Sequence, residues 1–150
     1  MSLRAWEIAI EERLKFGNPA AGLAGFGSDA VFVSAVPDEA QVPRLPNRMV
    51  RPYVAIWYGQ RIQGNDGYRS ICGVRASAYR ANFLVQVMAH DGSLNRDAVA
   101  LVSDLLLGFK PAGQGELLES SSSTIRRPLD MSGVRGRISV PVAYSGTVDL

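Results

Sequence analysis

The most restrictive feature of this sequence is a short segment that is apolar on both sides. Residues 53–58 read Tyr-Val-Ala-Ile-Trp-Tyr, a run of aromatic and β-branched residues that favours a strand. Side chains alternate along a strand, so Tyr53 and Trp57 would lie on one face of a sheet and Val54 and Ile56 on the other. A sheet built around this strand therefore needs cover on both faces.

Two amphipathic helices and several further strands are predicted around this segment. Apolar residues recur at helical spacing over residues 2–16 and 93–108. Strand patterns occupy residues 30–36, 68–72, 78–90, 115–125 and 137–144. In the last of these, Pro141 lacks an N–H donor, which places the strand at an edge or leaves part of it unpaired. We therefore expect one α+β domain over residues 1–150, with a mixed, mostly antiparallel sheet and both helices packed on one face.

Two helices on one face would leave the other face of this sheet uncovered. Its exposure would create an apolar patch larger than monomeric proteins usually tolerate. Residues 37–52 are rich in proline and polar enough to form an exposed, extended arm. A second copy of the chain is therefore the expected cover of the second face.

Charge is unevenly distributed along the chain, although its net value is only +2. Residues 40–80 carry seven arginines against Asp66 alone, whereas residues 1–39 and 81–119 each carry a net charge of −3. The basic segment could bind nucleic acid or the acidic segments of a neighbouring copy. Scattered, solvated arginines are an equally good interpretation.

The sequence has no feature that indicates a membrane protein or a secreted one. No run approaches the ~18 consecutive apolar residues of a membrane-spanning helix. Charged residues such as Arg4 and Glu7 interrupt the N-terminal apolar pattern, unlike the continuous apolar region of a signal peptide. The protein is therefore expected to fold and act in a cytoplasm, or to be assembled there.

Side chains suited to catalysis or to metal binding are few. The chain has one cysteine, Cys72, and one histidine, His90, too few for the usual zinc sites. A Ser-His-Asp site would have to use His90, and Asp91 follows it too directly to orient it. Residues 25–30 formally fit a G-x-G-x-x-A dinucleotide pattern, but they follow a predicted helix and open a strand, the reverse of the required order. We expect a protein that is not an enzyme and needs no cofactor or metal.

Two carboxylate pairs lie on the predicted helices. Asp97 and Asp104 are spaced to share one helix face, opposite the apolar stripe. Paired carboxylates can bind metal or transfer protons, but nothing in the pattern implies a pocket around these. A solvated helix face is the expectation for this pair and equally for Glu11 and Glu12.

A series of short motifs spans nearly the whole chain after an N-terminal helix and a glycine loop. They are residues 29–37 (DAVFVSAVP), 51–57 (RPYVAIW), 69–73 (RSICG), 83–87 (FLVQV), 95–100 (NRDAVA) and 138–144 (ISVPVAY). In this order they resemble the tail terminator proteins of long-tailed bacteriophages, particularly those of actinobacterial hosts. The order of the motifs carries more weight than any single one.

The resemblance implies a structural virion protein that assembles as a ring, a hexamer, on the finished tail tube. Such a ring stops tube polymerisation and joins the tail to the head-completion, or stopper, protein at the head–tail junction. Phage DNA would pass through its lumen without sequence-specific binding, and the family has no catalytic residues to carry over. We expect subunit or tube contacts at the arm 37–52, at the loop 59–69 and at seven arginines: Arg51, Arg61, Arg69, Arg126, Arg127, Arg135 and Arg137.

Three alternatives remain open. The first is a head-completion or neck connector protein, which would contact the portal side of the junction. The second is a small-ligand enzyme or binding protein on a dimeric α+β sheet, with His90 and Asp91 in a pocket. The third is a nucleic-acid-binding module that uses residues 44–80, for which a steep salt dependence of binding is expected.

Overall fold

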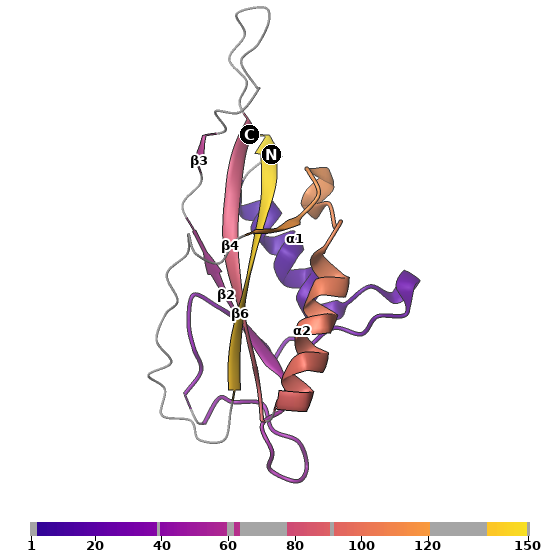
Figure 1. The fold of residues 1–150 in the computed structure, drawn as a ribbon, viewed down its shortest axis with the longest axis vertical. Coiled ribbons are helices and arrows are strands. Elements are labelled where there is room, and N and C mark those ends of the chain that lie inside the picture. Colours follow the sequence, from indigo (N-terminus) through magenta and orange to yellow (C-terminus); the bar gives the residue numbers. More distant parts are fainter. Residues whose placement is uncertain are drawn as a thin grey trace, which may run out of the picture.

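One sheet and two α-helices make up the described part of the chain (Figure 1). The computed structural model describes residues 3–38, 40–59, 62–63, 78–90, 92–120 and 138–149. The α-helices are α1 (Leu3–Phe16) and α2 (Gly92–Leu106), and two 3-10 turns are η1 (Pro19–Ala21) and η2 (Pro111–Gly113). The strands are β1 (Val31–Val33), β2 (Tyr53–Tyr58), β3 (Ile62–Gln63), β4 (Ala78–Ala89), β5 (Leu118–Ser120) and β6 (Ile138–Asp149).

The sheet has the strand order β1-β2-β4-β6-β5, and β3 pairs with β4 beyond the end of β2. β1 is parallel to β2, and every other pairing between described strands is antiparallel. The predicted α+β class with a mixed, mostly antiparallel sheet is therefore confirmed. β2 occupies the predicted residues 53–58, whereas β1 is shorter than predicted because Ser34 has a positive φ of 55°. The strand predicted at 68–72 lies outside the described residues.

β4 and β6 form the longest ribbon of the sheet. Each is 12 residues long, and they pair over their whole length, 78–89 against 138–149. β6 therefore continues beyond its predicted end at residue 144. Pro141 lies opposite Gln86, in a stretch that the described strand β5 does not reach, because β5 pairs only with residues 143–145. Among the described strands, this part of β6 has the edge position expected for a strand proline.

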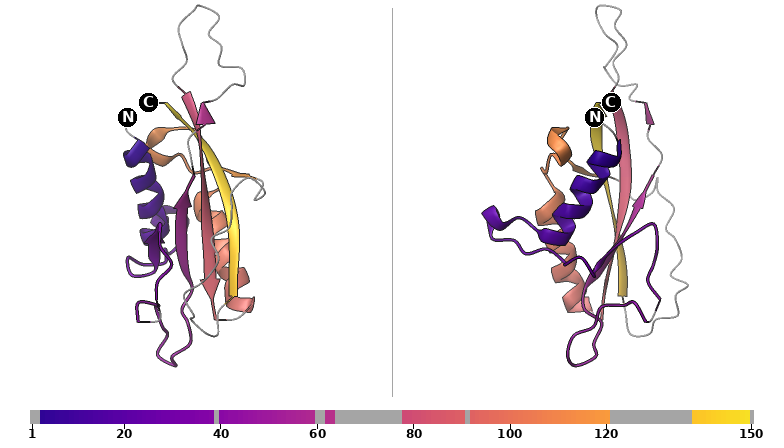
Figure 2. Two further views of the ribbon diagram at one scale, coloured as in Figure 1. Left: turned by 90° about the vertical axis from the view of Figure 1, so that its left-hand side faces the viewer. Right: turned by 180° about the vertical axis from the view of Figure 1, so that it is seen from behind.

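Side chains from both α-helices belong to one hydrophobic cluster that packs on one face of the sheet (Figure 2). Phe83 of β4 lies within it: its ring meets the indole of Trp6 edge-on with centroids 5.7 Å apart and stacks on Tyr144 at 5.6 Å. Val54 and Ile56 of β2 contribute from the same face. The helices supply further apolar side chains, among them Ile10, Leu14, Val102, Leu105 and Leu106.

The Pro-rich segment covers part of the second face of the sheet, which corrects two expectations. Val42 and Val50 are 6% and 1% exposed and pack with Tyr53, Ala55 and Met88 in a second hydrophobic cluster. Figure 2 shows the segment on the side of the sheet away from the helices. Residues 37–52 are therefore not a wholly exposed arm, and a second copy is not needed to cover this part of the sheet. The polar composition of residues 37–52 did not predict this packing, because two buried valines are enough to anchor the segment to the sheet.

A buried amide also lies on this second face. The side chain of Gln86 is 1% exposed, accepts a hydrogen bond from the indole N–H of Trp57 at 3.3 Å and donates one to the hydroxyl of Ser139 at 2.8 Å. A buried amide without partners would be costly, so this network ties β2, β4 and β6 together in one register.

The glycine loop after α1 is held by a close crossing of two backbone segments. The amides of Phe26 and Gly27 donate hydrogen bonds to the carbonyls of Leu14 and Lys15, which the helix itself leaves unpaired. A Cβ on Gly25 would lie against the backbone carbonyl of Lys15, deep inside van der Waals contact. This crossing sets the chain on its path from α1 into β1.

Candidate functional site

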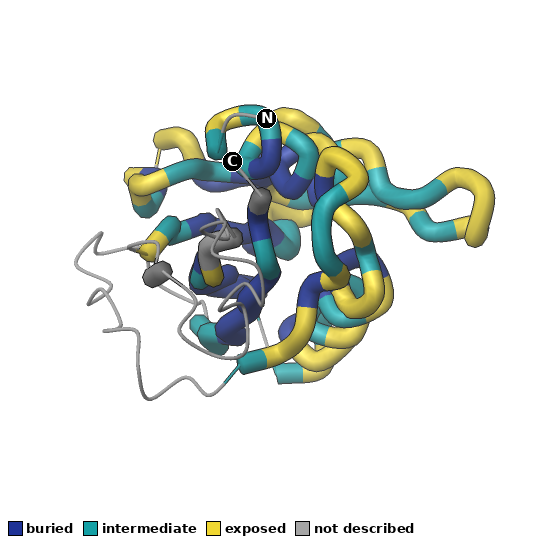
Figure 3. Tube along the Cα trace, turned by 90° about the horizontal axis from the view of Figure 1, so that it is seen from above, coloured by how far each residue is buried: buried dark blue, intermediate teal, exposed yellow. Residues whose placement is uncertain are grey.

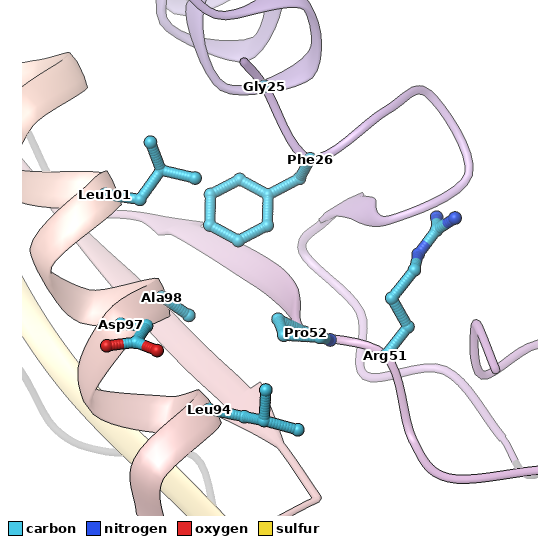
Figure 4. A pocket seen from close by; sticks show the side chains of 8 residues that line it. All are labelled: Gly25, Phe26, Arg51, Pro52, Leu94, Asp97, Ala98 and Leu101. Atoms are coloured by element: carbon cyan, nitrogen blue, oxygen red, sulfur yellow. The ribbon is translucent and has the colours of Figure 1, made fainter. Parts of the chain in front are cut away.

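A pocket of about 270 Å³ opens between the glycine loop, the start of β2 and the first half of α2 (Figure 4). The ring of Phe26 points across it toward α2, and Pro52 lies across from Leu94. Its lining is mostly apolar and consists of Gly25, Phe26, Arg51, Pro52, Leu94, Asp97, Ala98 and Leu101. The pocket therefore suits an apolar group better than a charged one.

Two charged residues stand at the margin of this pocket. Arg51 lines it with its aliphatic stem, while its guanidinium points away and donates to the carboxylate of Asp29 at 2.6 Å (Figure 4). Asp97 is exposed on the outer side of α2. Arg51, one of the arginines expected at an interface, is thus paired within its own chain and also shapes the pocket wall.

A second polar cluster joins α1 to β2. Arg4 donates to Glu11 at 3.0 Å and to Glu7 at 3.3 Å, and the phenol of Tyr58 donates to the carbonyl of Glu7 at 3.1 Å and to the carboxylate of Glu11 at 3.3 Å. Glu11 is only 7% exposed, so its expected place on a solvated helix face is wrong. Its partner Arg4 lies seven positions earlier, which puts both side chains on one side of the helix. The seven-residue spacing of Arg4 and Glu11 was the feature of the sequence that could have indicated this ion pair.

The pKa of the Tyr58 phenol is raised well above its usual range. Burial is the main cause, because it disfavours the charged phenolate, and the negative charges of Glu11 and Glu7 add to it. Tyr58 therefore acts as a permanent hydrogen-bond donor at neutral pH, and its role in this cluster is to hold α1 on the sheet.

Replacing Tyr58 by phenylalanine is expected to lower the free energy of unfolding at pH 7 by about 1–2 kcal/mol, because it removes a buried donor. The difference from the unaltered protein should shrink as the pH rises above about 10. Above that pH, unfolding of the unaltered protein lets the Tyr58 phenol ionise, which stabilises its unfolded state. The variant has no phenol at this position, so its unfolded state does not gain this stabilisation. Urea unfolding at several pH values measures both effects.

Tyr144→Phe is the matched control for the loss at neutral pH. The Tyr144 hydroxyl lies 3.4 Å from the hydroxyl of Ser103, a long contact, so its removal should cost less than that of the Tyr58 hydroxyl. Equal losses from the two variants at pH 7 would contradict the role assigned to the Arg4–Glu11–Tyr58 cluster.

Most of the other residues expected at an interface lie outside the described part of the chain. These are Arg61, Arg69, Arg126, Arg127, Arg135 and Arg137, together with most of the loop 59–69. Cys72 and Asp91 also lie outside it, whereas His90 is half-buried at the end of β4 and does not line the pocket. Residues 25–30 lead from a helix into strand β1, the order that speaks against a dinucleotide loop.

Figure 3 shows how burial is distributed over the fold: buried residues follow the strands and the inner sides of the helices. Within the described ranges, no group of three or more His, Cys, Asp or Glu residues is placed to hold a metal ion. No helix among the described residues is long and apolar enough to cross a membrane. Asp97 and Asp104 are both exposed, as expected for a solvated helix face, but Asp97 also lines the pocket, which the sequence pattern did not imply.

No model of a protein family matches the sequence, and no curated protein matches it significantly.

Proposed function

We propose that this chain is a structural subunit that forms a ring at the head-proximal end of a phage tail. There it ends tail tube polymerisation and joins the tail to the head-completion protein. The observation that carries the proposal is the order of the family-like motifs in the sequence. Five of the six motifs overlap a described strand or helix (β1, β2, β4, α2 and β6), and the motif at residues 69–73 lies outside the described residues. The proposal uses the order and spacing of these motifs and does not depend on any catalytic residue.

The charge of the chain supports self-association as part of this function. The segment 40–51 contains Arg44, Arg48 and Arg51 and no acidic residue, and Arg44 and Arg48 are exposed. Residues 114–120 contain Glu116 and Glu119, both exposed, and no basic residue. Arg51 is already paired with Asp29, and Glu116 with Lys110, inside the chain, so self-association by charge would rest on Arg48 and Glu119.

The decisive experiment mixes the purified protein with tail tube protein during polymerisation and images the tubes by negative-stain electron microscopy. We expect a ring at one end of each tube and a tube length that stops increasing once the protein is added. Tubes that keep growing with no protein at their ends would reject the proposal. A parallel pull-down with separated heads and tails tests the alternative, since binding to heads alone would identify a head-completion protein.

Charge reversal tests whether the basic loop takes part. The double variant Arg61→Glu/Arg69→Glu is expected to bind tubes at least ~tenfold more weakly, because like charges at an interface are strongly unfavourable, with an unchanged thermal unfolding midpoint. Arg96→Glu reverses an exposed charge on α2 and should bind normally. Unchanged tube binding by the double variant would remove both arginines from the interface.

A further inference from the structure

The pocket between the glycine loop and α2 has one charge that the described part of the chain does not offset. Its charged lining residues are Arg51 and Asp97. The guanidinium of Arg51 donates to the carboxylate of Asp29 at 2.6 Å, so its positive charge is offset within the chain. Among the described residues, Asp97 forms no ion pair or hydrogen bond. The pocket therefore has a net negative charge at its rim.

This carboxylate lies directly beside apolar side chains of the same helix. One face of α2 supplies four lining residues at helical spacing: Leu94, Asp97, Ala98 and Leu101. Figure 4 shows Asp97 on the α2 wall next to Ala98. Asp97 is exposed, whereas Ala98 is only 4% exposed and closes the wall behind it. A cation that pairs with Asp97 can therefore stay in contact with water while the group attached to it enters the pocket.

The interior of the pocket sets the size and polarity of that attached group. The volume is about 270 Å³, and a water molecule occupies about 30 Å³, so the pocket holds about nine atoms of that size. Five lining residues are apolar: Phe26, Pro52, Leu94, Ala98 and Leu101. Water in such a pocket finds few hydrogen-bond partners, so a short aliphatic chain or a single ring that displaces it gains free energy.

The same lining disfavours an anionic ligand. The guanidinium of Arg51 points away from the pocket toward Asp29 (Figure 4). The Nε of Arg51 has no acceptor among the described residues, but it is buried and so lies out of reach of a pocket occupant. Arg96 is exposed one position before Asp97 but does not line the pocket. An anion in the pocket would therefore meet the negative charge of Asp97 and no available cation of the lining.

We propose that this pocket binds a small organic ammonium ion. Its aliphatic or aromatic body lies between Phe26 and the apolar face of α2, and its ammonium group pairs with the carboxylate of Asp97 at the rim. The inference goes beyond the proposed function and does not rest on it, because it uses only the lining of the pocket.

Titration with three probes that share one apolar body tests the preference for positive charge. The probes n-hexylammonium, n-hexanol and n-hexanoate are added at pH 7 and low salt to the isotope-labelled full chain, and the NMR shifts of backbone amides around the pocket are followed. We expect n-hexylammonium to bind about threefold more tightly than n-hexanol, the modest gain typical of an ion pair with an exposed carboxylate. Binding of n-hexanoate should be the weakest. Added salt should weaken the binding of n-hexylammonium and leave that of n-hexanol unchanged.

Two matched variants assign the preference to one carboxylate. Asp97→Asn keeps the shape of the side chain and removes its charge, so n-hexylammonium and n-hexanol should then bind with equal affinity. Asp104→Asn is the same change at another exposed position of α2, outside the lining of the pocket, and should keep the roughly threefold preference. Both side chains are exposed, so neither change should alter the fold.

Three results would overturn the inference: equal affinities of n-hexylammonium and n-hexanol for the unaltered protein, a preference that survives in Asp97→Asn, or no saturable shifts around the pocket with any probe. A preference that Asp97→Asn abolishes and Asp104→Asn retains supports it. These outcomes are separate from the proposed function, because tube termination is measured with tail tubes and without an amine.

Discussion

Replacing Phe83 by alanine is expected to lower the free energy of unfolding by about 3–5 kcal/mol, the usual cost of removing a buried phenylalanine. Phe83 is 0% exposed and contacts rings from three other elements: Trp6 of α1, Tyr58 of β2 and Tyr144 of β6, with centroids 5.6–6.1 Å away. The substitution would leave a cavity where these elements meet and remove the edge-on contact with Trp6. Urea unfolding followed by tryptophan fluorescence and by circular dichroism measures the loss.

Phe16→Ala is the matched control, because it is the same change at a side chain that is 63% exposed. Its cost should stay within about 0.5 kcal/mol. If Phe83→Ala and Phe16→Ala destabilised the protein equally, the cluster around Phe83 would not be the main support of the fold.

The second large effect is expected at the crossing after α1. Gly25→Ala should cost about 2–3 kcal/mol, because its Cβ would collide with the backbone of Lys15, and backbone cannot move aside as a flexible side chain can. Relief of the collision would also lengthen the hydrogen bonds from Phe26 and Gly27 that close the end of the helix. Thermal and urea unfolding of the variant report the loss.

Gly22→Ala separates this collision from the effect of backbone conformation. Gly22 has a φ of 71°, which strains an alanine, but no atom lies within 4 Å of its added Cβ. Its replacement should cost only about 1 kcal/mol, the price of the left-handed conformation. A loss at Gly22 as large as the loss at Gly25 would show that the crossing is not tight in solution.

The proposed function rests on the order of motifs along the chain, which resembles that of phage tail terminators. The structure removes one earlier argument for oligomerisation, since the segment 37–52 covers part of the second face itself. The proposed ring therefore rests on the resemblance, and not on an uncovered face of the sheet.

The candidate site was only partly visible in the sequence. Leu94, Ala98 and Leu101 belong to the apolar stripe that predicts α2. The helical periodicity does not show which side chains of this stripe border a pocket in the folded protein. Phe26 reaches them from a glycine loop whose path depends on the crossing at Gly25. A pocket between segments distant in the chain leaves no local pattern.

Sequence alone determined where α1, β2 and α2 lie, although not where β1 and β6 end. The alternation over 53–58 and the helical spacing of Trp6, Ile10 and Leu14 are local patterns, and local sterics with amphipathicity are enough to convert them into β2 and α1. Only the tertiary structure decided what covers the second face of the sheet and that Glu11 is buried. Both depend on contacts between residues far apart in the chain. The periodicity of a sequence indicates which side of a helix or strand is buried, but it does not identify the residues that pack against that side.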